Sequence, residues 1–127
     1  MNGATYDTGA LLAAEAGDAR MWAKHRRLLE QRARPVVPAV VLAQAWRGGP
    51  QHRLSRLLAS CRIEDFGNRP ARDTGSALAA SGTRDIVDAA VVVSALMRGD
   101  EVITSDADDL LHIAGALGRR IDVRPPP

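Results

Sequence analysis

Aspartates follow two short apolar segments of this sequence, in positions where a carboxylate can do chemistry. Asp7 follows residues 4–6 and precedes a hydroxyl and a glycine, and Asp106 follows residues 101–104 with hydroxyls before it. The carboxyl ends of strands in an open parallel sheet form the edge where ligands bind. Helix capping by itself explains one such aspartate, but the repetition of the pattern favours a carboxylate site at that edge.

Further acids stand at the starts of two predicted helices. Asp85 and Asp88 are three residues apart, so they share one face of a helix. Asp85 suits a helix N-terminus, where a negative charge is favourable, whereas Asp88 lies one turn into an apolar helix and is harder to explain as a cap. Asp108 and Asp109 follow Asp106, and one of these two needs no role beyond favouring the helix dipole.

A parallel sheet can bring these carboxylates to one edge, and their chemistry indicates a hard metal ion. Clustered carboxylates without His or Cys ligands suit Mg²⁺ or Mn²⁺ rather than zinc. Left without a cation they repel one another and take up protons. Paired ions in such sites, about 3.5–4 Å apart, clamp the attacking and leaving oxygens of a phosphodiester. The pattern therefore indicates metal-assisted phosphodiester hydrolysis.

The predicted secondary structure alternates short apolar strands with helices. We predict strands over residues 4–6, 35–38, 62–66, 101–104 and 121–123, and helices over residues 8–16, 18–32, 39–46, 51–60, 68–81, 85–97 and 106–117. This alternation indicates a parallel sheet with helices on both faces. The apolar strands predict burial on both faces of the sheet. Thr8 is a candidate N-cap for the first helix.

Other proteins with an aspartate at a strand end fit this sequence poorly. A response-regulator receiver needs paired acids after its first strand and a lysine near its last, but the sole lysine is Lys24, in an early helix. A haloacid-dehalogenase-type phosphatase needs an Asp-x-Asp loop, and the loop here reads Asp7-Thr8-Gly9. The absence of a Gly-x-x-x-x-Gly-Lys sequence excludes a P-loop nucleotidase.

Composition indicates one ordinary globular domain without a membrane partner. The 127 residues are 46% hydrophobic and carry a net charge of +2, which by itself indicates a mixed solvated surface. The single cysteine, Cys61, excludes an internal disulfide, fits a reducing cytoplasm and is expected to be buried. The longest apolar run, residues 89–93, is too short to span a membrane. We expect no signal peptide, and residues 125–127, all proline, are expected to form a tail.

The acidic segments resemble the three motifs of PIN-domain ribonucleases. These segments are YDTGALLA with Asp7, DIVDAAVV with Asp88 and VITSDADDL with Asp106, and the size and layout resemble VapC toxins of toxin–antitoxin pairs. The resemblance covers residues 1–127 as one PIN-like α/β domain. It implies a three-layer sandwich around a five-stranded parallel sheet of order 3-2-1-4-5. It also implies Mg²⁺- or Mn²⁺-dependent cleavage of RNA, homodimerisation and neutralisation by a VapB-type antitoxin.

Carrying the family motifs onto this chain gives a predicted set of site residues. The predicted catalytic residues are Asp7, Asp88, Asp106 and Asp108, and the predicted metal ligands are Asp7, Asp85, Asp88 and Asp106. Thr8, Gln44, Arg47 and Thr104 are predicted to contact the substrate or to support the acids. Trp46 is the expected anchor for an antitoxin segment in a groove formed by helices 18–32, 39–46 and 51–60.

One position departs from the family pattern. Gln44 stands where the family usually carries a glutamate, and an amide is a poor ligand for Mg²⁺. Asp85 can compensate for this departure, and so can Arg47, by contacting phosphate. The alternative is a PIN-like module that has lost efficient catalysis and acts by binding RNA or a partner protein.

Overall fold

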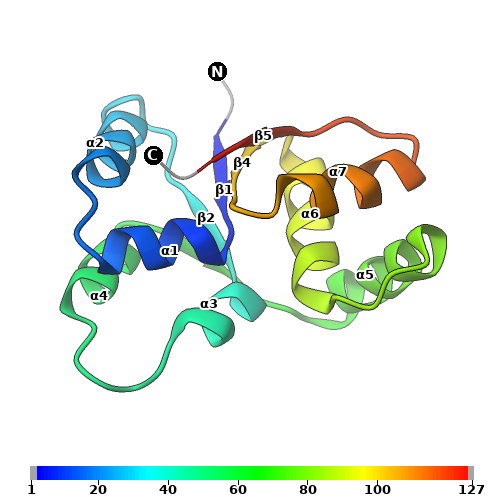
Figure 1. The fold of residues 1–127 in the computed structure, drawn as a ribbon, viewed down its shortest axis with the longest axis horizontal. Coiled ribbons are helices and arrows are strands. Elements are labelled where there is room, and N and C mark those ends of the chain that lie inside the picture. The colour runs from blue at the N-terminus through cyan, green and yellow to red at the C-terminus, as the bar shows by residue number, and fades with distance from the viewer. Residues whose placement is uncertain (1–2, 126–127) are drawn as a thin grey trace.

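Five parallel strands and seven helices alternate along the part of the chain that the computed structural model describes, residues 3–125 (Figure 1). The strands are β1 (Ala4–Tyr6), β2 (Val36–Pro38), β3 (Arg62–Glu64), β4 (Glu101–Ile103) and β5 (Asp122–Arg124). The helices are α1 (Thr8–Glu15), α2 (Ala19–Glu30), α3 (Ala39–Ala45), α4 (His52–Leu58), α5 (Asn68–Ser81), α6 (Ile86–Arg98) and α7 (Ala107–Ala116). The sheet order is β3-β2-β1-β4-β5, which confirms the predicted topology.

The helices form two layers, one on each face of the sheet. Figure 1 shows α1, α2 and α4 on one side of the strands and α5, α6 and α7 on the other. Helix α3 follows β2 directly and contacts both α1 and α6, so it links the two layers at the carboxyl end of the sheet. The predicted three-layer arrangement is confirmed.

The central strand sets the position of the predicted site. In the β1–β4 pair Tyr6 lies opposite Ile103, and the amide of Asp7 donates a hydrogen bond of 3.0 Å to the carbonyl of Ile103. The residues that follow these strands, Asp7 and Thr104, therefore emerge side by side. The register of two apolar strands thus brings together residues almost a hundred positions apart in sequence.

The inner strands β1 and β2 are buried on both faces, and β4 is buried except for the partly exposed Glu101, but the edge strands are not. All residues of β1 and β2 are buried, whereas Arg62 and Ile63 of β3 and Asp122 and Arg124 of β5 are exposed. The prediction of burial on both faces is therefore wrong for the two edge strands. Charged side chains on these strands disfavour pairing of the open sheet edges with another chain. The last strand also lies one residue later than predicted, because Ile103 pairs with Arg124.

Buried polar contacts tie helix α2 to the central strand. The imidazole of His25 lies between the Tyr6 hydroxyl, 2.8 Å from Nδ1, and the Ser60 hydroxyl, 2.7 Å from Nε2. Cys61, next to Ser60, is buried as expected. Within residues 3–125, no helix is both long and apolar enough to cross a membrane. Residues 126–127 of the predicted proline tail lie outside the described residues.

Candidate active site

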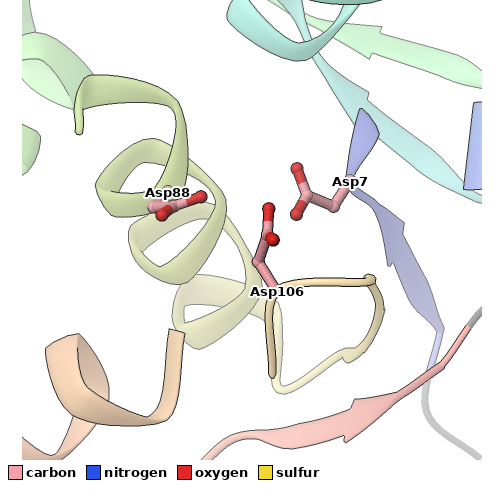
Figure 2. Close-up of side chains that lie close together, drawn as sticks. All are labelled: Asp7, Asp88 and Asp106. Carbon is pink, nitrogen blue, oxygen red and sulfur yellow. The ribbon is translucent and has the colours of Figure 1, made fainter. Parts of the chain in front are cut away.

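Three carboxylates meet at the carboxyl edge of the sheet. Asp7 follows β1, Asp88 lies in the first turn of α6, and Asp106 lies in the loop between β4 and α7. Each offers an oxygen within 4.8 Å of the others, and Figure 2 shows the three side chains converging on one region. The sequence prediction placed all three at this edge.

The Asp7 carboxylate is fixed by hydrogen bonds to both of its oxygens. Oδ1 accepts from the backbone amide of Thr8 at 2.8 Å, and Oδ2 accepts from the hydroxyl of Thr104 at 2.7 Å. Asp7 is thus the N-cap of α1, and the assignment of Thr8 as that cap is wrong. Burial raises the pKa of Asp7, while the hydrogen bonds from Thr104 and Thr8 act in the opposite direction.

Thr104 links two of the three acids. Its hydroxyl donates to Asp7 and accepts a hydrogen bond of 2.9 Å from the backbone amide of Asp106. The Thr104 side chain is buried, so these are its partners in place of water. Gly9 allows α1 to approach the same loop, because a Cβ atom there would lie 2.5 Å from the hydroxyl oxygen of Ser105. Thr104 therefore fixes the spacing between the first and third motifs.

Asp88 carries the strongest electrostatic signal of the site. Its residue is 7% exposed, and within residues 3–125 no donor forms a hydrogen bond with its carboxylate. Burial, the largest cause, and the nearby charges of Asp85, Asp7, Asp106 and Asp109 together raise the pKa of Asp88 to about 7. A carboxylate in this setting needs a cation or a proton.

Asp85 supports Asp88 and lies beside the three-carboxylate cluster. It is the N-cap of α6, and its Oδ1 accepts a hydrogen bond of 2.9 Å from the amide of Asp88. It also lines a surface hollow next to Asp88. Asp85 is outside the group of acids whose oxygens approach within 4.8 Å of one another, so capping accounts for the contact that the structure shows.

The predicted helix-start acids Asp108 and Asp109 take different positions. Both line an exposed hollow with Ser105 and Asp106, but only Asp109 also lines the hollow beside Asp88. The sequence analysis chose Asp108 and left out Asp109. The spacing contained the signal, because Asp109 lies three residues after Asp106 and so shares its side of the helix.

Of the remaining predicted residues, Gln44 lies near the acids and Arg47 lies away from them. The Thr8 hydroxyl donates a hydrogen bond to Oε1 of Gln44, so Gln44 reaches the start of α1 beside Asp7. The guanidinium of Arg47 instead donates to the carbonyl of Trp46 at 2.8 Å. Arg47 follows the end of α3 and, within the described residues, forms no hydrogen bond or ion pair with the three acids.

The donor set of this cluster fits a hard divalent cation. The three converging ligand atoms are carboxylate oxygens, the type that Mg²⁺ and Mn²⁺ prefer. Burial and the nearby acids raise the pKa of Asp88, and a bound cation would offset the repulsion among these acids. The arrangement is thus suited to binding a metal ion at a site that a phosphate can reach.

Comparisons with known proteins agree with this geometry. Residues 5–116 match the PIN domain. No curated protein matches the sequence significantly. Among solved structures, VapBC2 from Rickettsia felis, bound to a promoter DNA fragment, has a TM-score of 0.71 at 15% identity over 96% of this chain and 97% of that chain.

Two other solved structures share the fold. DNA-bound VapBC from Salmonella typhimurium has a TM-score of 0.68 at 18% identity, over 98% of both chains. PAE2754 from Pyrobaculum aerophilum has a TM-score of 0.64 at 14% identity, over 96% of this chain and 83% of that chain. At these identities the likeness establishes the fold.

Proposed function

Because the chain belongs to the PIN-domain family, we propose that it is a Mg²⁺- or Mn²⁺-dependent endoribonuclease that hydrolyses phosphodiester bonds of RNA. The observation that carries this proposal is the convergence of Asp7, Asp88 and Asp106 at the carboxyl edge of the sheet. A carboxylate cluster without a counter-charge is unfavourable for a stable fold, so its presence favours a catalytic use.

The three converging aspartates are the proposed metal ligands, with Asp85 as a supporting carboxylate beside Asp88. A bound Mg²⁺ or Mn²⁺ supplies Lewis-acid polarisation of a phosphate and lowers the pKa of water. Thr104 keeps Asp7 and Asp106 in fixed relative positions through its two hydrogen bonds. Asp108 is exposed beside Asp106, and we propose it as an acceptor for the proton that the attacking water loses.

We further propose that the protein is the toxin of a type II toxin–antitoxin pair and that it acts in the cytoplasm. Two of the similar structures are VapBC complexes, and the acidic motifs resemble those of VapC toxins. An apolar groove suits an amphipathic antitoxin segment and is lined by Ala39, Leu42, Ala43, Trp46 and Leu58. Trp46 is 41% exposed there, as expected for a binding anchor. Homodimerisation follows from the same resemblance.

A second candidate function rests on Gln44. This residue reaches Thr8 at the edge of the site but brings no negative charge. A PIN domain with a weakened metal site can act by binding RNA or a partner protein without efficient cleavage. The two functions differ in whether the purified protein hydrolyses RNA when Mn²⁺ is added.

The test is cleavage of total bacterial RNA by the purified full-length protein with and without Mn²⁺. We expect cleavage that requires the metal and that Asp7→Asn abolishes. Asp18→Asn is a suitable control, because Asp18 caps α2 through the amides of Arg20 and Met21, and asparagine caps equally well. If folded wild-type protein leaves RNA intact at millimolar Mn²⁺, the binding-module function is the correct one.

A further inference from the structure

The hollow beside Asp88 contains cationic as well as acidic side chains. It is lined by Thr83, Arg84, Asp85, Asp88, Asp109, His112 and Ile113. A second hollow, which shares Asp109 with the first, is lined by Ser105, Asp106, Ala107, Asp108 and Asp109, with no cationic residue among them. A polyanion that reaches the three acids therefore finds a cationic side chain, Arg84, in the first hollow and none in the second.

Arg84 is available for a ligand. Its side chain is exposed, and it makes no ion pair within residues 3–125, although three carboxylates line the same hollow. Arg98 and Arg69, in contrast, are each paired with a carboxylate. A free planar guanidinium presents donors that match two phosphate oxygens.

The chain segment around Arg84 is held in place by local hydrogen bonds. The Ser81 hydroxyl lies 2.8 Å from the Thr83 hydroxyl, and Asp85 caps α6 through the amide of Asp88. Nε2 of His112 donates to the Ser81 carbonyl at 3.0 Å, which ties this segment to α7. Arg84 thus projects from a backbone anchored on both sides, so less conformational freedom is lost when its guanidinium binds an anion.

We propose that Arg84 binds a phosphate of the RNA substrate next to the one that is cleaved, in the hollow between α6 and α7. This inference rests on the proposed ribonuclease function. It sets the direction in which the strand leaves the acids, over Arg84 and His112 and away from Asp108. A contact of this kind positions the strand without contributing sequence preference, because every nucleotide carries the same phosphate.

The test compares Arg84→Ala with Arg120→Ala, an equal loss of charge at an exposed arginine in the loop after α7. Initial rates on total bacterial RNA with Mn²⁺ give the apparent KM, kcat and their dependence on salt. We expect Arg84→Ala to raise KM by about tenfold with little change in kcat. The slope of log(1/KM) against log salt should become shallower by about 0.7, the value for one phosphate contact on a single strand. Arg84→Lys should retain the slope.

The other outcomes overturn the inference. Equal KM values and equal slopes for Arg84→Ala and Arg120→Ala would show that Arg84 contacts no phosphate. A loss confined to kcat would place Arg84 in the chemistry rather than in binding. Thermal unfolding confirms that each variant is folded. If wild-type protein cleaves no RNA, the proposed function fails as well, and this result is distinct from cleavage that is indifferent to Arg84.

Discussion

The two ends of helix α6 differ in whether their charged side chains have partners. At the C-terminal end, the Arg98 guanidinium contacts Asp100 at 2.8 Å and Glu64 at 2.5 Å, and it donates to the hydroxyls of Thr5 at 2.9 Å and Ser94 at 2.7 Å. At the N-terminal end, Asp88 faces other acids, and no donor within the described residues binds its carboxylate. The charge at the C-terminal end is therefore compensated by opposite charges, whereas the charge at the N-terminal end is unsatisfied.

The difference separates structural charge from functional charge. The Arg98 network joins β1, β3 and α6 and leaves few of its polar groups unpaired, as expected of buried charges that stabilise a fold. The cluster around Asp88 raises the pKa of a buried acid without providing a partner. An arrangement that costs stability in the absence of a ligand indicates a binding or catalytic site. Variants at each end should therefore affect different properties.

Removal of the Asp88 charge should have the largest effect, and that effect should be a loss of activity without a loss of the fold. We expect Asp88→Asn to reduce kcat/KM for RNA cleavage by about 10³-fold at saturating Mn²⁺, because a metal ligand acts directly at the reacting phosphate. The protein should remain folded, since no hydrogen bond to the carboxylate is lost. Asp122→Asn, on the exposed edge strand β5, is the control. Wild-type activity in Asp88→Asn would remove Asp88 from the site.

Removal of Arg98 should have the second largest effect, and that effect should be on stability. Arg98→Met leaves Glu64 and Asp100 without their cation in a partly buried environment. We expect a loss of about 3 kcal/mol in the free energy of unfolding, measured by urea denaturation. Arg69→Ala breaks a highly exposed pair with Asp73 and should cost less than about 0.5 kcal/mol. Equal losses for the two variants would contradict the structural role of the Arg98 network.

The pH dependence of the free energy of unfolding should report on the unpaired Asp88 carboxylate at the N-terminal end of α6. Burial and like charges raise the pKa of Asp88 from 3.8 to about 7, so the native state binds this proton more tightly than the unfolded state. The resulting stabilisation is complete below pH 3.8 and is lost as pH rises through about 7. In EDTA, Asp88→Asn should therefore become more stable than wild type by up to about 4 kcal/mol at pH 8, with no such gain at pH 4.

Metal should reverse this difference. Mn²⁺ binds the native cluster and stabilises it by mass action, and the effect should be larger at pH 8 than at pH 5.5 because more of Asp88 is ionised. Thermal unfolding with and without Mn²⁺ at both pH values measures this shift. An equal shift for wild type and Asp88→Asn would mean that the ion binds elsewhere.

The sequence was sufficient for the parts of this comparison that depend on local pattern. Strand and helix alternation predicted the elements, and the order of the aspartates, with the family resemblance, predicted the cluster of Asp7, Asp88 and Asp106. The Arg98 network was not predictable, because Thr5 and Glu64 come from strands far from α6 in sequence, and no local spacing links them to Arg98. The position of Asp109 in the hollow beside Asp88 was unpredictable for a related reason, since it depends on how α7 is rotated toward Asp88.

The hydrogen bond between Thr104 and Asp7 was predictable only in part. The sequence analysis named both residues: Thr104 as the last residue of a predicted strand, and Asp7 as the residue that follows another predicted strand. The contact itself depends on the register of β1 against β4. Register in a parallel pair is fixed by packing on both faces of the sheet, which no local pattern contains.

The smallest predicted effect concerns Gln44, where a substitution adds one more negative charge beside the acids. The Gln44 amide oxygen accepts a hydrogen bond from the Thr8 hydroxyl, and Asp7 precedes Thr8. Gln44→Glu preserves the length of the side chain and this acceptor while adding a negative charge beside the acids. If Gln44 occupies the position of a lost ligand, Gln44→Glu should tighten Mn²⁺ binding by about tenfold, the effect of roughly one charged contact, and should speed RNA cleavage.

Two further substitutions, Gln44→Ala and Asp85→Asn, decide between this explanation and its alternatives. Gln44→Ala should change cleavage little if the amide holds no metal, whereas a loss of about 10²-fold would show that Gln44 positions water or substrate. If Asp85 supplies the missing charge, Asp85→Asn should be as damaging as Asp88→Asn. Asparagine at position 85 still caps α6, so the fold is preserved and the comparison isolates the charge. Cleavage by Asp85→Asn at the wild-type rate, with unchanged Mn²⁺ dependence, would leave Asp85 a helix cap and nothing more.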